Sequence, residues 1–112
     1  MARTQITVQS ITRSGLQPTN TALIADGHKF LNDGKLTFIQ VENGATAFTL
    51  TIQTPKTVDG LAVAERTISI GTNEEHLIGP FPADTYNQAD GMVYLDYSDV
   101  TDGTVSVLKL GT

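Results

Sequence analysis

The sequence predicts an all-β fold: a single-domain β-sandwich or jelly-roll-like barrel of about seven to nine short antiparallel strands. Thr occurs 17 times, and the apolar residues are rich in Val and Ile. These β-branched side chains suit a pleated strand. Apolar residues recur with a period of two, and no window keeps helical spacing for three turns. Six Asn-Gly or Asp-Gly pairs supply tight turns between short strands.

The predicted strands lie at intervals of about eight to twelve residues, the spacing found in sandwiches and barrels. In chain order they are Gln5–Ile11, Ala22–Ala25, Lys29–Leu31, Leu36–Val41, Ala47–Ile52, Arg66–Ile70, Glu75–Ile78, Met92–Tyr97 and Thr104–Leu110. The four prolines fall between these strands, where a missing N–H costs no ladder hydrogen bond.

The clearest predicted unit is a hairpin from Lys35 to Gln53. Its arms, Leu36–Val41 and Ala47–Ile52, flank Asn43-Gly44, and a type I′ turn there would match the twist of the strands. The strand Thr104–Leu110 has less cleanly separated faces, which we expect of a terminal strand partly covered on both sides.

Two segments lack the period-two pattern, namely Ser14–Thr21 and Thr54–Glu65. Each is a candidate long connection between sheets, or an arm that lies on a partner. Residues 1–5 are a candidate extended N-terminal arm. No repeat or linker divides the chain, so we expect residues 1–112 to form one β domain.

Composition and charge exclude several classes of protein. The chain has 112 residues and no cysteine, which rules out disulfides, thiolate-bound zinc and a cysteine nucleophile. The net charge is −5, with −6 in residues 67–112, and the basic residues are scattered singly. Nucleic-acid binding needs clustered bases, and a membrane span needs about 20 apolar residues. We therefore expect neither partner, and the first residues lack the apolar stretch of a secretory signal.

The sequence contains no convincing catalytic or metal-binding motif. His28 and His76 lie far apart, without metal-ligand spacing, and each is expected at the surface or at a strand edge. Asp96–Asp102 superficially resembles a calcium loop, but Val107 stands where an EF-hand needs Glu. We expect a loop whose Asp side chains bond their own backbone, with a calcium ion there left open. No G-x-S-x-G nucleophile turn is present. The sequence thus predicts neither an enzyme nor a cofactor.

The segment Gly79–Asn87 allows two interpretations. It holds Phe81 between Pro80 and Pro82, with Tyr86 five residues later. In the first interpretation it crosses between sheets, and its two aromatic rings close one end of the core. In the second, exposed rings form a preorganised anchor for another protein chain, which loses little entropy on docking. The candidate partner-binding residues are Pro80, Phe81, Pro82 and Tyr86.

Several stretches taken together carry a resemblance. They are Asp26–Gly34, Val41–Gly44, Thr51–Pro55, Val58–Val63, and the run Gly79-Pro80-Phe81-Pro82, Tyr86-Asn87, Asp90-Gly91, Val93-Tyr94, Tyr97-Ser98. The pattern resembles small virion structural proteins of tailed bacteriophages, and most of all the capsid decoration proteins, also called cement or stapling proteins. The resemblance implies a β-sandwich or jelly roll made in the host bacterial cytoplasm and located on the capsid surface. It also implies a major capsid protein as partner and a homodimer or homotrimer.

Other functions remain open from the sequence. A carbohydrate- or receptor-binding module of a phage tail predicts a concave face with exposed Tyr86, Tyr94 or Tyr97. A head–tail completion protein is a further alternative among small phage β-domains. A small hydrolase would require His28 or His76 within hydrogen-bond reach of a nucleophile.

Overall fold

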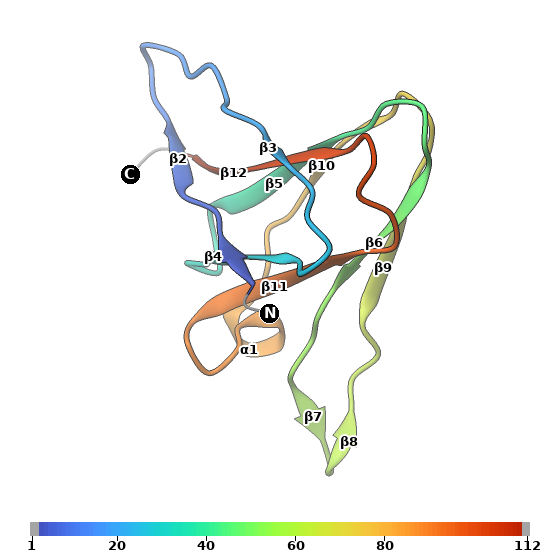
Figure 1. Ribbon diagram of the computed structural model, residues 1–112. Coiled ribbons are helices and arrows are strands. Elements are labelled where there is room, and N and C mark those ends of the chain that lie inside the picture. The colour runs from blue at the N-terminus through green and yellow to red at the C-terminus, as the bar shows by residue number, and fades with distance from the viewer. Residues whose placement is uncertain (1–2, 111–112) are drawn as a thin grey trace.

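Two mixed β-sheets pack face to face in the computed structural model, which describes residues 3–110 (Figure 1). The first sheet has the order β1-β4-β11-β6-β9, with strands β1 (Thr4–Gln5), β4 (His28–Leu31), β11 (Met92–Tyr97), β6 (Phe48–Ile52) and β9 (Arg66–Ile70). The second has the order β10-β5-β12-β2, with β10 (Glu75–Ile78), β5 (Thr37–Glu42), β12 (Thr104–Leu110) and β2 (Val8–Ile11). Strand β3 (Thr21–Ala22) also pairs with β12. The predicted all-β sandwich is confirmed.

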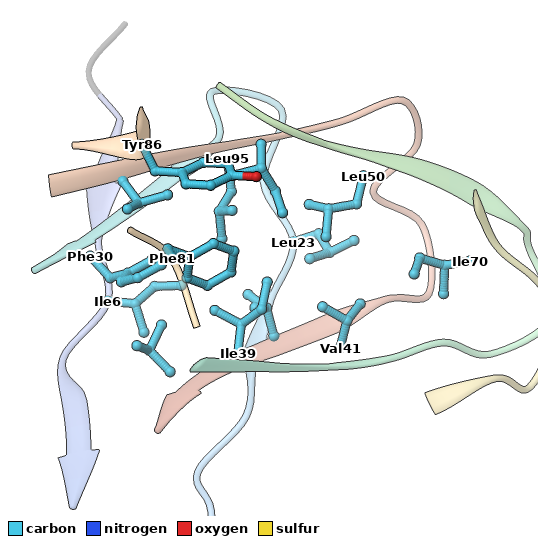
Figure 2. Packing of buried hydrophobic residues seen from close by; sticks show 14 of the residues in the cluster. Ile6, Leu23, Phe30, Ile39, Val41, Leu50, Ile70, Phe81, Tyr86 and Leu95 are labelled. Atoms are coloured by element: carbon cyan, nitrogen blue, oxygen red, sulfur yellow. The ribbon is translucent and has the colours of Figure 1, made fainter. Parts of the chain in front are cut away.

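The core lies between the sheets and follows from the alternation of side chains. Strand β5 buries Ile39 and Val41, and β6 buries Leu50 and Ile52, while the intervening residues are half-buried. Side chains at positions i and i+2 share one face of a strand. Figure 2 shows the result: Ile39 and Val41 point from one sheet toward Leu50 from the other.

The predicted hairpin from Lys35 to Gln53 is wrong. Strand β5 pairs with β10 and β12 in the second sheet, whereas β6 pairs with β11 and β9 in the first. The chain crosses between the sheets at Asn43-Gly44, where Gly44 does not have the positive φ of a type I′ turn. The Asn43 side chain donates instead to the carbonyls of Thr46 and Gly71, each at 2.9 Å. Alternation identifies the buried face of a strand but not its pairing partner.

A type I′ geometry does occur at Asp59-Gly60, with φ of 54° and 78°. It joins β7 (Thr57–Val58) to β8 (Leu61–Ala62), and this short ladder prolongs the β6–β9 hairpin away from the sandwich (Figure 1). The segment Thr54–Glu65 is therefore a projecting hairpin arm and not a crossing between sheets. We call it the arm.

The N-terminal strand differs from the prediction. The expected strand Gln5–Ile11 is two strands: β1 runs parallel to β4 in the first sheet, and β2 runs parallel to β12 in the second. Between them Ile6, only 5% exposed, inserts into the core. Residues 3–5 are thus docked onto the sandwich and do not form a free arm, while the rest of the predicted arm, residues 1–2, lies outside the described residues. A period-two pattern carries no information on strand direction, so it could not reveal the parallel pairs.

The remaining connections follow the prediction more closely. The strands expected at Arg66–Ile70, Glu75–Ile78, Met92–Tyr97 and Thr104–Leu110 are present with those bounds. Both faces of β12 are covered, since Ser106 and Leu108 are buried as well as Val105 and Val107. The segment Ser14–Thr21 links β2 to β3 along the same edge of β12 and does not cross between sheets. Across residues 3–110, none of the helical structure could cross a bilayer.

Candidate binding surfaces

The crossover Gly79–Asn87 connects β10 to β11 and contains the one short helix of the described residues, α1 (Ala83–Tyr86). Its two aromatic rings lie in the core, with Phe81 2% and Tyr86 9% exposed. Figure 2 shows them beside each other near Phe30, and the Phe81 and Tyr86 ring centroids are 5.4 Å apart in an edge-to-face arrangement. The interpretation as an exposed aromatic anchor is therefore wrong, because both rings close one end of the core. Only Pro80 and Pro82 of the predicted residues are exposed.

The crossover is held by a buried amide. The Asn32 side chain, 8% exposed, donates from Nδ2 to the Phe81 carbonyl at 2.8 Å and to Asn87 Oδ1 at 2.7 Å. Its Oδ1 accepts the backbone N–H of Gly34 at 3.1 Å. A buried polar group satisfied in this way fixes the backbone around it. The segment is thus a structural closure of the sandwich.

The arm presents uncovered apolar side chains. Val58 is 54% and Leu61 is 72% exposed. The two residues are cross-strand partners, so their side chains share one face of the ladder. The turn Asp59-Gly60 lies directly between them, and Figure 1 shows this end of the arm as the point farthest along its projection from the sandwich. Exposed apolar side chains that lie together on a projecting hairpin are typical of a protein-binding element.

Contacts at the base set the direction of the arm. Lys56 Nζ lies 2.5 Å from Asp84 Oδ2 on α1, and Arg66 Nε donates to the Tyr86 hydroxyl at 2.9 Å. Across the base, the Thr54 hydroxyl donates to the Val63 carbonyl at 2.9 Å. The base of the arm is therefore connected to α1 on both sides, by Lys56 before β7 and by Arg66 at the start of β9. A projection held in one direction loses less conformational entropy when it docks.

A second uncovered apolar surface lies on the outer face of the second sheet. Side chains of β5, β10 and β12 there form a groove of about 320 Å³, lined by Lys35, Leu36, Thr37, Phe38, Leu77, Ile78, Gly79, Pro80 and Leu110. Leu77 is 68%, Leu110 57% and Leu36 39% exposed. Among these lining residues Lys35 carries the only charge.

We did not predict this groove from the sequence, although a signal for it was present. Leu36, directly before β5, and Phe38 in β5 alternate with buried Thr37 and Ile39 and so point to the outer face. In β12 the outer-face position Leu110 is apolar as well. Apolar residues on both faces of neighbouring strands are typical of a sheet that is covered on both faces.

The two histidines have different environments. His28 is fully buried, since it lies on the same core-facing side of β4 as Phe30, so its expected place at the surface is wrong. Its Nδ1 lies 2.7 Å from the Tyr97 hydroxyl. Burial, assisted by the positive charge of Arg3, lowers the pKa of His28, and burial raises the pKa of Tyr97.

His76 does lie on an edge strand, β10, with Nε2 3.1 Å from Glu74 Oε1. Within residues 3–110 neither imidazole is hydrogen-bonded to a Ser or Thr hydroxyl. The nucleophile–base contact that a hydrolase would need is thus not formed there.

The three carboxylates of the predicted calcium-like loop are directed to separate partners. Asp96 accepts from Arg3 and Gln53, each at 2.6 Å, Asp99 accepts from the Thr101 N–H at 2.8 Å, and Asp102 accepts from the Thr46 N–H at 3.0 Å. No group of three potential metal-ligating side chains occurs within residues 3–110. Asp99 and Thr101 form the local turn that we expected, while the other two carboxylates bind distant segments.

The tyrosines do not form an open stacking platform for a sugar. Tyr86 is buried, and Tyr97 packs edge-on against His28 and Phe48. The guanidinium of Arg3 covers the Tyr94 ring at 4.7 Å from its centroid. A carbohydrate-binding face needs aromatic rings free to stack on the sugar.

Comparison with protein-family models, with curated proteins and with solved structures finds no match for this chain.

Proposed function

We propose that this chain is a non-enzymatic virion structural protein of a tailed phage, a capsid decoration protein that binds the major capsid protein and stabilises the assembled head. The family resemblance supplies the phage context. One structural observation carries the mode of action: the anchored arm projects an apolar pair that no part of its own described chain covers. Such a protein acts through shape and contact and needs no reactive centre.

Physical reasoning connects this geometry with stabilisation of a shell. A protein that binds neighbouring capsomers, but not separated subunits, shifts the equilibrium toward the closed shell by mass action. Each contact can be modest, because many equivalent sites on one lattice multiply their effect through avidity. A rigid sandwich with a directed arm is suited to this task, since little order has to be gained on binding.

The alternatives receive unequal support. The covered tyrosines count against a carbohydrate-binding module. A head–tail completion protein would use the same kind of protein contact, so the arm does not favour either location. Binding to closed shells without a portal separates the two, because a completion protein binds at the portal vertex.

The proposal is tested with portal-free expanded shells assembled from the major capsid protein encoded in the same genome. We expect saturable co-sedimentation at all capsomers and a higher melting temperature of the shells by calorimetry. Shells of an unrelated capsid protein serve as the control. No co-sedimentation at protein concentrations up to about 1 mM would contradict the proposal, because even weak specific contacts are occupied there.

A variant pair connects the arm with this binding. We expect Leu61→Ser to weaken shell binding by about tenfold or more, since a buried leucine contributes about 1.5–3 kcal/mol. Leu31→Ser is the matched control, because Leu31 is 56% exposed on β4 and belongs neither to the arm nor to the residues that line the groove. Equal binding by the two variants would show that the arm does not contribute to shell binding.

A further inference from the structure

We propose that the arm of one copy inserts its Val58–Leu61 pair into the apolar groove of a second copy, so that neighbouring copies associate head to tail. The inference rests on the proposed function and gives the arm a second copy as its partner. On a shell, this contact between neighbouring copies adds to the contacts that each copy makes with the capsid, so loss of Leu61 weakens shell binding through it. It is testable without shells, since both halves of the contact belong to the same polypeptide.

The two surfaces are complementary in apolar character. The arm carries one convex apolar pair that flanks a two-residue turn. The groove is a concave apolar depression with a volume of about 320 Å³. Each contains leucines with more than half of their surface exposed, Leu61 on the arm and Leu77 and Leu110 in the groove. Uncovered apolar patches of this kind mark contacts with other chains. Because the arm leads away from its own sandwich (Figure 1), it leaves the groove of its own chain open.

The charges beside these apolar groups are complementary as well. Asp59 is exposed in the turn between Val58 and Leu61 and is the only charged residue of residues 57–62. Lys35 is exposed next to Leu36 and is the only charge among the groove residues. An arm seated with its apolar pair in the groove would therefore bring an anion near a cation at the rim. Opposite charges placed in this way orient a contact and speed its formation.

The contact joins two different surfaces, so it is heterologous, unlike the isologous contact of a two-fold dimer. Every copy retains a free arm or a free groove until a ring closes. Repetition of this contact would produce a closed ring or a row of copies, an arrangement suited to the repeated sites of a lattice.

The first test is the mass of the protein in solution, measured by sedimentation equilibrium up to about 1 mM. We expect concentration-dependent association of the wild-type chain, and a monomer for Leu61→Ser on the arm and for Leu77→Ser in the groove. Leu31→Ser should associate like the wild type, since Leu31 lies outside both surfaces. A wild-type chain that stays monomeric, or association that survives both arm and groove variants, would overturn the inference.

The decisive step is to mix the two deficient variants. Leu61→Ser keeps an intact groove and Leu77→Ser keeps an intact arm, so an equimolar mixture should form a 1:1 heterodimer and nothing larger. A two-fold contact of groove on groove would not be restored by mixing, and that result would overturn the inference.

The charge pair is tested separately by Asp59→Asn and Lys35→Gln. Asn tolerates the positive φ of position 59, so the turn is retained. We expect each variant to weaken association about two- to fivefold. The double variant, with both changes in one chain, should lose little more affinity than either single variant. Additive losses would overturn the assigned pairing of these charges.

The outcomes separate the inference from the proposed function. Binding to shells by a wild-type chain that does not self-associate would overturn the inference and leave the function supported. Self-association without shell binding would do the reverse.

Discussion

The crossover Gly79–Asn87 and the arm Thr54–Glu65 both connect strands of the sandwich, yet they have opposite places in the molecule. The crossover carries two aromatic rings and folds into the core, where Asn32 fastens its backbone. The apolar side chains of the arm are all aliphatic, and its Val58–Leu61 pair stays exposed. The contrast teaches that large aromatic residues beside prolines indicate core closure at least as readily as a docking site. The arm, which contains no aromatic residue, holds the candidate binding element.

The largest effect should come from the buried side of this comparison. Phe81→Ala removes a ring that packs against Phe30 and Tyr86, and it leaves a cavity between the sheets. We expect the free energy of unfolding to fall by about 3–5 kcal/mol, the usual cost of deleting a buried phenylalanine. Urea unfolding measures the change. A loss below about 1 kcal/mol would mean that the ring is not part of the core.

The pH dependence of stability sharpens the comparison, because the core contains a titratable group at His28. Its folded-state pKa is lowered from 6.5, chiefly by burial and also by Arg3. Below about pH 6.5 the unfolded chain therefore binds a proton that the folded chain does not. The free energy of unfolding should keep its full value above that pH. It should fall as the pH drops below it, by at most about 1.4 kcal/mol per pH unit.

Urea unfolding between pH 7.5 and pH 5 measures this slope, with His28→Gln as the comparison. Gln keeps a polar side chain but does not titrate, so its stability should change less over the same range. Equal slopes for the two chains would show that His28 is not the responsible group.

A smaller and local effect is expected at the turn of the arm. Gly60 has φ of 78° with no atom within 4 Å of an added Cβ, so Gly60→Ala is strained by its backbone and not by crowding. The cost is about 1–2 kcal/mol. Amide exchange of Val63, whose N–H donates to the Lys56 carbonyl at 3.2 Å, should speed up by about fivefold or more, while exchange in β5 should not change. Gly60→Asn is the control, since Asn tolerates this conformation. Unchanged exchange in Gly60→Ala would contradict the type I′ geometry.

The smallest effect on stability is expected at the exposed end of the comparison. Leu61→Ser should change the free energy of unfolding by no more than about 0.5 kcal/mol, because the side chain is 72% exposed and packs against little. Its consequence should be confined to association. A large loss of stability in the monomer would show that Leu61 packs within its own chain.

The sequence predicted the fold class well and the candidate site poorly. Alternation in Met92–Tyr97 and Thr104–Leu110 sufficed to identify strands and their buried faces. It did not reveal that the strands beside Asn43-Gly44 belong to opposite sheets, because a strand has the same alternation whether its neighbour in sequence lies beside it or across the core.

The same limit applies to the binding surfaces. Exposure depends on what the fold places over a residue, so Phe81 and Leu61 could not be told apart by hydrophobicity. The groove was recognisable only as apolar residues at the outer-face positions Leu36, Phe38 and Leu110, and its boundary with β10 arises from the topology.

The absence of cysteine from the chain allows the central claim, that the arm engages another chain, to be tested with a single label. A nitroxide is attached at Ala62→Cys, which is exposed on the ladder face opposite Val58 and Leu61. Its mobility is measured by electron paramagnetic resonance as the protein concentration rises and after shells are added, with a label at Leu31→Cys as reference. We expect the label at position 62 to become immobilised while the reference label does not. A label at position 62 that stays equally mobile in the free, concentrated and shell-bound protein would contradict it.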